Sequence, residues 1–326
     1  MSDAGRVAIT IVTFNSSAFI RQCLRYVFEQ DCTGIEVIIV DNASSDGTIE
    51  ILREYERQAR VVYNRENTGF AAGQNQAIAL TNAEWILTLN PDVRLTSNFL
   101  RMLVTAGEAE SGVGSVCGKL LAMAPDFEVP ERAVFDSTGI YMTRNLRHLD
   151  RGSRIPDEGQ RDKAEYVFGG TGAACLYRRR MVEDISIGGE FFDEDFFAYR
   201  EDADVAWRAQ LMGWKCLYTP LAVAYHVRSV LPHNRSAVPA VLNMHSVKNR
   251  WLLRIKNMTG GVYRRYWLPI TVRDVVVIGG CVVREWRSLP AFWLVLRKLP
   301  STLAKRREIM QRRRVSDDQM ARWFCN

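Results

Sequence analysis

Short apolar segments alternate with helix-like segments over the first 90 residues, and this alternation limits the fold more than any other feature. The apolar segments are rich in β-branched residues and lack the polar alternation of a half-exposed strand, so they indicate strands buried on both faces. They lie at residues 7–13, 36–40, 61–63 and 85–89, with helix patterns at 17–29, 48–60 and 73–80. This order predicts an α/β fold with a mostly parallel, Rossmann-like sheet flanked by helices.

Polar side chains follow three of the predicted strands. Asn15 comes after the first strand, Asp41 after the second, and Asn90 and Asp92 after the fourth. Parallel sheets bind ligands in the crevice at the carboxyl ends of their strands, and Mg²⁺ or Mn²⁺ prefers carboxylates combined with substrate phosphates. The same residue types also suit turns and helix caps, so these motifs alone leave a ligand site and a structural role both open.

A cluster of carboxylates opens a predicted helix at 202–212. Glu201, Asp202 and Asp204 are favoured at a helix N-terminus in any case, and Asp204 is spaced to pair with Arg208. The functional alternative is that one carboxylate is a general base held ionised at the helix start. His226 follows a strand-like stretch, where a single histidine is more often structural than a metal ligand.

Taken in order, these motifs resemble the family 2 glycosyltransferases of GT-A fold, in particular the bacterial rhamnosyltransferase-like branch that builds cell-surface polysaccharides. The resemblance covers about residues 7–230. The matching stretches are ITIVTFNS (9–16), VDNASSDGT (40–48), NTGFAAGQN (67–75), LNPDV (89–93), FFDEDFFAYREDADVAWR (191–208) and YTPLAVAYHVRS (218–229).

The resemblance implies an inverting transfer of a sugar from a nucleotide-diphospho sugar to a hydroxyl of a lipid-linked glycan. A dTDP- or UDP-linked donor is expected, with dTDP-L-rhamnose weakly favoured, and Mg²⁺ or Mn²⁺ as cofactor. Asp202 matches the family's catalytic base, and Asp92 and His226 match its metal ligands. Donor-binding positions correspond to Thr13, Asn15, Asp41, Asn67, Gly69, Asn75 and Asn90, and acceptor-side positions to Asp193, Glu194 and Glu201.

The sequence departs from the family pattern at two positions. The D-x-D metal motif is Asn90-Pro91-Asp92 here, with one carboxylate in place of two. Ala77 stands where many relatives have glycine, which matters only if the helix packs very closely. A catalytically silent binding or scaffold protein of the same fold is therefore the alternative function. A Rossmann oxidoreductase is disfavoured because no G-x-G-x-x-G follows the first strand.

The charge is divided unevenly along the chain. From His245 onward there are 18 basic and 5 acidic residues, whereas the preceding part is net acidic. This basic region also contains five tryptophans, a composition that suits a helix lying in lipid headgroups. The alternative is an oligomerisation or packing module whose tryptophans are core. A nucleic-acid partner is not expected, because no recognition fold is visible.

The expected organisation is a glycosyltransferase domain followed by a helical basic region. Residues 1–240 form the first, with a nucleotide-sugar half (1–95) and an acceptor half (96–240), and residues 241–326 form the second. The longest apolar run, 275–283, is too short to span a bilayer, so a membrane-surface protein is favoured over a spanning one. Seven cysteines without C-x-x-C spacing indicate reduced thiols. The predicted location is the cytoplasm, at the inner face of the cell membrane.

Overall fold

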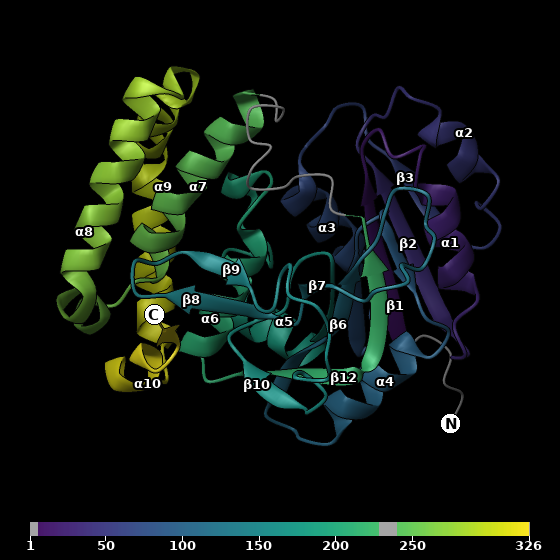
Figure 1. The fold of residues 1–326 in the computed structure, drawn as a ribbon. Coiled ribbons are helices and arrows are strands. Elements are labelled where there is room, and N and C mark those ends of the chain that lie inside the picture. The colour runs from purple at the N-terminus through teal and green to yellow at the C-terminus, as the bar shows by residue number, and fades with distance from the viewer. Residues whose placement is uncertain (1–5, 228–239, 326) are drawn as a thin grey trace.

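A computed structural model describes residues 6–227 and 240–325. A large central sheet forms the body of the molecule (Figure 1). Its strand order is β10-β12-β6-β11-β4-β1-β2-β3, with β5 added to β12 and β7 added to β6. The strands are β1 (Val7–Thr13), β2 (Ile35–Asp41), β3 (Arg60–Tyr63), β4 (Trp85–Leu89), β5 (Val93–Leu95), β6 (Val113–Ala122), β7 (Phe135–Ser137), β10 (Glu165–Val167), β11 (Ala174–Arg178) and β12 (Lys215–His226).

The first half of the chain forms the parallel part of this sheet. β1 pairs in parallel with β2 and β4, and β2 pairs in parallel with β3. β1 is buried along its whole length, as its continuous apolar sequence predicts. The α/β prediction is confirmed. The helices of this half are α1 (Ile20–Phe28), α2 (Thr48–Arg53), α3 (Phe70–Ala79) and α4 (Phe99–Glu108).

Two predicted helices are shorter in the structure. α1 begins at Ile20 instead of Ser17, because the carbonyl oxygen of Ser16 accepts the first turn's hydrogen bonds and the Ser17 N–H donates to Asp46. α2 ends at Arg53, and turns replace the helix predicted up to residue 60. The start of α1 lies at the sheet's carboxyl edge, where loop hydrogen bonds compete with helix formation.

The second half makes the sheet mixed. β11 lies antiparallel between β4 and β6, whereas β12 runs parallel to β6. The predicted helix at 202–212 is present one residue earlier, as α6. The helical elements here are α5 (Arg179–Ile185), the short 3-10 helix η1 (Glu194–Phe196) and α6 (Glu201–Leu211).

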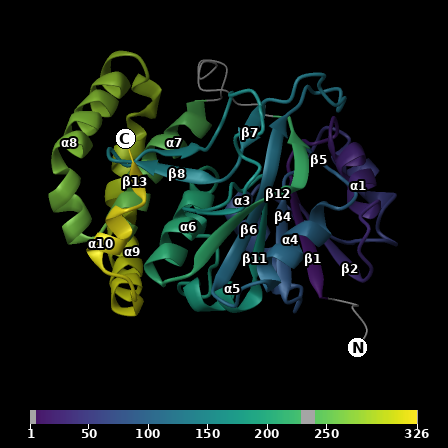
Figure 2. The same cartoon turned by 60° about the horizontal axis from the view of Figure 1, so that its bottom comes forward.

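The C-terminal region is helical, as predicted, and packs beside the sheet domain. Its last strand pairs in parallel with β8 and completes a small three-stranded sheet (Figure 2). The elements are α7 (Ala240–Asn257), α8 (Gly260–Val283), η3 (Trp286–Ser288), α9 (Pro290–Arg312), α10 (Asp317–Ala321) and β13 (Phe324–Cys325), with β8 (Ile140–Thr143) and β9 (His148–Asp150) completing the small sheet.

One hydrophobic core joins this region to the sheet domain. Trp207 of α6 packs in the same cluster as Leu252 of α7, Tyr266 of α8 and Phe324 of β13. Packing is therefore continuous across the boundary that is predicted at residue 240. Some tryptophans of this region pack against the core, as the packing-module alternative expects, and others are exposed, as contact with a membrane surface would require. Trp251 and Trp323 are partly buried against core residues, whereas Trp267, Trp286 and Trp293 are 54–64% exposed.

Helix α8 is the most exposed apolar element. It bends at Tyr266, one turn before Pro269, as expected where proline disturbs the helix ladder. By length and composition alone it meets the requirement for a membrane-crossing helix, with only 17% of its apolar window buried. The sequence pattern predicts no spanning helix, because the apolar run at 275–283 is too short by itself. The helix extends that run across Arg273 and Asp274.

Candidate active site

The loops after β1 and β2 are joined by the carboxylate of Asp41. This side chain is fully buried and accepts hydrogen bonds from Thr13 Oγ1 (2.7 Å), Ser44 Oγ (2.6 Å) and the Ser44 N–H (2.9 Å). The Asn15 N–H donates to the same Ser44 hydroxyl (2.8 Å). The predicted donor residues Thr13, Asn15 and Asp41 thus lie together. A carboxylate can accept about four hydrogen bonds, and Asp41 accepts three from the two loops. One acceptor position therefore remains.

The start of α3 is fixed by glycine and a local turn. Asn67 Oδ1 accepts the Gly69 N–H (2.9 Å), and Gly69 adopts φ +89°. A Cβ atom at Gly69 would lie 2.6 Å from the carbonyl oxygen of Phe197, so no other residue fits without moving the backbone. The donor-side loop therefore touches the segment that leads into α6. Ala77, the departure from the family pattern, is buried against Val12 and does not obstruct this packing.

Asn75 connects the same two parts of the chain. Its amide donates to the carbonyl oxygen of Phe192 (2.8 Å) and to Glu194 Oε1 (3.0 Å), and accepts the Phe192 N–H (2.9 Å). Both ends of the amide are therefore satisfied within the protein. Its predicted donor-binding role stays a prediction, as does that of Asn90, whose backbone N–H donates to Ala173 (2.9 Å) at the end of β4.

Asp92 and His226 meet at the carboxyl edge of the sheet. His226 Nε2 lies 3.4 Å from Asp92 Oδ1, and His226 Nδ1 lies 2.8 Å from Asp136 Oδ2. Asp92 Oδ1 is buried and has no hydrogen-bond partner among the described residues. An imidazole held by a carboxylate on one nitrogen and facing a second oxygen ligand with the other is a common metal-binding arrangement. Asp136 was missed by the sequence analysis.

These residues fit a divalent cation. Two ligands at about 2.1 Å from a Mg²⁺ ion in octahedral geometry stand roughly 3 Å apart, close to the observed separation of Nε2 and Oδ1. Within residues 6–227 and 240–325, no group of three or more His, Cys, Asp or Glu side chains is placed to hold a metal. The protein would thus supply two ligands, leaving the remaining positions for water and substrate phosphates.

The electrostatics of His226 follow from its two carboxylate neighbours. Burial by itself lowers the pKa of His226, but the hydrogen bond with Asp136 and the negative charge of nearby Asp92 outweigh it and raise the pKa to about 10. The two carboxylates therefore favour positive charge at His226, the same preference that would favour a cation beside Asp92.

Asp202 stands at the first turn of α6. Its Oδ2 accepts the Gly172 N–H (3.0 Å) and its Oδ1 accepts the Ala203 N–H (2.7 Å). Burial raises the pKa of Asp202, and the hydrogen bond from Gly172 opposes that rise. Asp202 therefore combines a fixed position with a higher proton affinity than an exposed aspartate, the properties of a general base.

The three acceptor-side predictions lie in different environments. Glu201 is buried, and burial followed by the charge of Asp202 raises its pKa to about 8. Glu194 is exposed and binds Asn75. Asp193 is buried and accepts hydrogen bonds from Lys256 of α7 and Lys305 of α9 (2.6 Å to the latter). The role of each in acceptor binding stays a prediction.

A family model and several known proteins are similar to this chain. Residues 8–186 match the model of the family described as Glycosyl transferase family 2. The chain is 24% identical to the N-acetylglucosaminyl-diphospho-decaprenol L-rhamnosyltransferase of Mycobacterium tuberculosis, over 68% of this chain and 80% of that one. It is 23% identical to the putative glycosyltransferase EpsE of Bacillus subtilis, over 81% and 99% of the two chains.

Solved structures share the fold. The mannosyltransferase PcManGT from Pyrobaculum calidifontis, in complex with GDP-Man and Mn²⁺, aligns with a TM-score of 0.54 at 15% identity, over 95% of this chain and 86% of that chain. S. aureus TarS 1–349 in complex with UDP-GlcNAc aligns with a TM-score of 0.54 at 17% identity, over 95% and 82%. The predicted GT-A fold is confirmed, and with more than half of its length matched by the family model, the chain belongs to glycosyl transferase family 2.

Proposed function

We propose that the protein transfers a sugar, with inversion, from a nucleotide-diphospho sugar to a hydroxyl group of a lipid-linked glycan. The observation that carries this proposal is the position of Asp202, held by the Gly172 N–H at the start of α6. The relative from M. tuberculosis is named for rhamnosyl transfer to a lipid-linked diphosphate sugar, which supports a similar acceptor in polysaccharide synthesis. L-Rhamnose from dTDP-L-rhamnose is the first donor to test, with UDP-sugars second.

The chemistry is a single displacement. The acceptor oxygen bonds to the anomeric carbon as the bond from that carbon to the β-phosphate oxygen breaks, and Asp202 takes the acceptor's proton. A divalent cation, when bound, stabilises the negative charge that develops on the leaving diphosphate. Asp92 and His226 would hold that cation, and Asp136 would orient the imidazole. No covalent enzyme intermediate is needed.

Exposed apolar side chains on α8, η3 and the start of α9 support attachment to the cytoplasmic leaflet. They include three exposed tryptophans and alternate along the sequence with basic residues, which together suit the headgroup region of an anionic membrane. The exposed apolar side chains include Trp267, Val275, Val276, Val282, Val283, Trp286, Trp293 and Leu296. A protein bound there would meet a lipid-linked acceptor at the bilayer surface.

The test is a transfer assay with the full chain, Mn²⁺ or Mg²⁺, candidate nucleotide sugars and a short prenyl diphosphate carrying N-acetylglucosamine. Wild-type protein should form product with inverted anomeric configuration, read by NMR. Asp202→Asn should lower kcat by about 10²–10⁴-fold with the donor Kd unchanged. Asp318→Asn, an aspartate whose side chain is 91% exposed, is the matched control and should be unaffected. Near-wild-type turnover in Asp202→Asn would refute the base, and absence of transfer with every donor would favour a scaffold function.

A further inference from the structure

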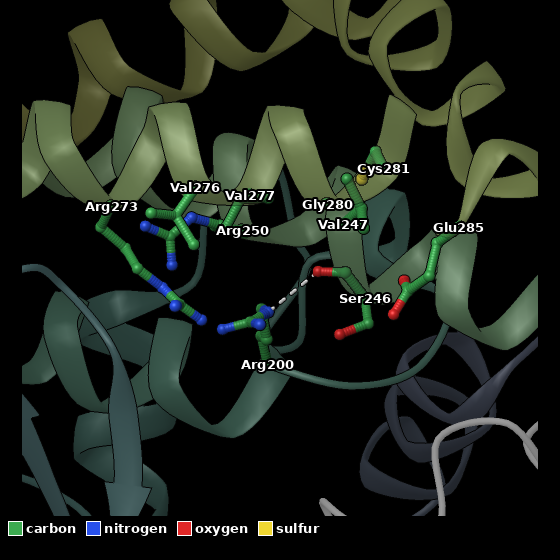
Figure 3. Close-up of a pocket in the computed structure, with 10 residues that line it drawn as sticks. All are labelled: Arg200, Ser246, Val247, Arg250, Arg273, Val276, Val277, Gly280, Cys281 and Glu285. Carbon is green, nitrogen blue, oxygen red and sulfur yellow. Dashed lines mark hydrogen bonds between the residues drawn. The ribbon is translucent and has the colours of Figure 1, made fainter. Parts of the chain in front are cut away.

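A second pocket lies on the acceptor side of the molecule, apart from the Asp92–His226 pair. Its volume is about 150 Å³, and it is enclosed by α7, α8 and the residue preceding α6. Three arginines from these three elements line it, and Figure 3 shows the side chains of Arg200 and Arg273 reaching toward each other from opposite walls. Arg250 completes the set, and Glu285 lines the far end.

Positive charge dominates this pocket. Arg250 donates to Asp274 (3.3 Å), but Asp274 is shared with Arg254, whose Nη2 lies 2.9 Å away. Among the described residues that line the pocket, three carry guanidinium groups and one, Glu285, carries a carboxylate. Burial and then the charge of Arg254 lower the pKa of Arg250 to about 10, so the pocket holds these charges close together at a cost. An anion bound between them would relieve that cost.

His148 lies in the same positively charged surroundings. Its Nδ1 lies 2.9 Å from Arg200 Nη1, so the imidazole accepts a hydrogen bond from the guanidinium. Burial, and then the charges of Arg200 and Arg147, hold the pKa of His148 well below its usual range. The histidine is therefore neutral at physiological pH and does not add to the charge that an anion would have to balance.

The pocket also contains an unused hydrogen-bond donor. Arg250 is 3% exposed, and its Nε has no acceptor in the part of the chain that the structure describes. Buried donors without an acceptor are uncommon and costly, and guanidinium groups bind phosphate oxygens in a two-point geometry. A phosphate-type anion is the ligand whose oxygens would match these donors.

The position relates the pocket to the reaction. Arg200 precedes α6 by one residue, stands two residues before Asp202, and is fixed in a left-handed conformation (φ +74°) by donating to the carbonyl oxygen of Ser246 (3.1 Å). The other wall is α8, where Val276 lines the pocket and is 55% exposed. The pocket thus lies between the candidate base and the apolar helix face.

We infer that this pocket binds the diphosphate that joins an acceptor sugar to its lipid. The inference rests on the proposed function. A sugar whose hydroxyl faces Asp202 would place its linking phosphates beside Arg200, Arg250 and Arg273, and the lipid chain would leave along the exposed face of α8. The headgroup phosphate of an ordinary anionic phospholipid has related chemistry and is the competing source.

Binding of geranyl diphosphate to the full chain, measured by isothermal titration in EDTA so that the donor metal site is empty, tests the inference. Arg273→Gln should raise the Kd at least tenfold. Arg284→Gln removes an exposed charge from the end of the same helix and should change the Kd less than twofold, as should Asp92→Asn. Glu285→Gln should lower the Kd, a result that a folding defect would not produce.

Equal binding by wild type and Arg273→Gln, or no binding by wild type, would overturn the inference. A phospholipid headgroup in the pocket would give a different result. Geranyl diphosphate would then not bind, and attachment to phosphatidylglycerol vesicles would fall in Arg273→Gln but not in Arg284→Gln. That result would also overturn the inference. The transfer assay separates the two proposals. If Arg273→Gln is active and its kcat/KM for the lipid acceptor is unchanged, only the proposed role of the pocket is refuted. If binding depends on Arg273 but no transfer occurs, only the proposed reaction is refuted.

Discussion

Asn249 on α7 donates its side-chain amide to the carbonyl oxygen of Tyr199, 2.8 Å away and three residues before Asp202. The same amide nitrogen also lies 2.8 Å from the carbonyl oxygens of Phe196 and Ala198. Asn249 is fully buried, so these contacts are shielded from water. A helix outside the family match therefore fixes the approach to the candidate base.

The first prediction concerns this contact. Phe197, Tyr199 and Arg200 all have positive φ, a conformation that persists only when the surroundings enforce it. Asn249→Ala should lower the free energy of unfolding by about 2 kcal/mol and kcat by about tenfold or more, with the donor Kd unchanged. Ser246→Ala is the control, because it keeps the backbone carbonyl that receives Arg200. Unchanged kcat in a folded Asn249→Ala protein would show that the segment holds its shape alone.

The second prediction concerns metal binding. If Asp92 and His226 are ligands, His226→Ala and Asp92→Asn should each weaken Mn²⁺ binding in the presence of a nucleoside diphosphate, measured by electron paramagnetic resonance. Asp136→Asn should raise the metal Kd by about 10–100-fold through loss of the imidazole's orientation. Asp126→Asn, an exposed aspartate in the nearby loop, should leave the Kd unchanged. Full Mn²⁺ affinity in Asp136→Asn would contradict the arrangement.

The sequence was sufficient to predict the parts of the site that depend on neighbours in the chain. Asp41, Asp92 and Asp202 each follow a buried strand or open a helix, so their positions come directly from the local pattern.

Residues that act across long separations could not be found in this way. Asp136 contacts His226 from 90 positions away, and Lys256 reaches Asp204 from 52 positions away. Neither pair has a spacing that distinguishes it from surface charge. The basic composition of the C-terminal region suggested a separate surface module, and it concealed the buried part of α7, where Asn249 and Lys256 lie with almost no exposure.

The third prediction is a pH dependence from Glu201. Its pKa is raised from an ordinary 4.5 to about 8, so between these values the folded protein binds more protons than the unfolded chain. The contribution of this group to stability should therefore fall as pH rises from 5 to 8, by up to about 1.4 kcal/mol per pH unit. Urea unfolding at each pH should show this slope in wild type and lose it in Glu201→Gln. Identical slopes in the two proteins would show that Glu201 is ionised in the fold.

The fourth prediction tests the buried ion pairs between α6 and α7. Lys256 is 1% exposed and donates to both Asp193 and Asp204 (2.8 Å to the latter). Lys256→Met should cost about 3–5 kcal/mol, because it removes one cation from each of two buried carboxylates, leaving Asp193 with Lys305 alone and Asp204 with Arg208 alone. Lys298→Met breaks a pair with Asp195 in which the lysine side chain is 44% exposed, and should cost less than about 1 kcal/mol. Equal losses in the two variants, measured by chemical unfolding, would contradict this account.

The fifth prediction concerns the membrane. The full chain should sediment with vesicles containing phosphatidylglycerol at low salt and be released as the salt concentration rises, because screening weakens the basic contribution. Serine at Trp267, Trp286 and Trp293 together should weaken this binding by about tenfold or more. Leu221→Ser replaces an apolar residue of similar exposure on β12 and should have no effect. Soluble wild-type protein at low salt would exclude attachment through this face, and a change of sedimentation coefficient with protein concentration would instead indicate a second copy.

The contact between Gly69 and Phe197 has a consequence for how substrate preference can change. The loop that carries the donor-side residues has no free space against the segment that leads to Asp202. A substitution that reshapes the donor-side loop must displace the segment that leads to Asp202, and the reverse also holds. Donor preference and acceptor preference therefore cannot change independently. Recombining the donor half of one relative with the acceptor half of another would break this fit, and new specificities would have to arise by paired changes on both sides of the contact.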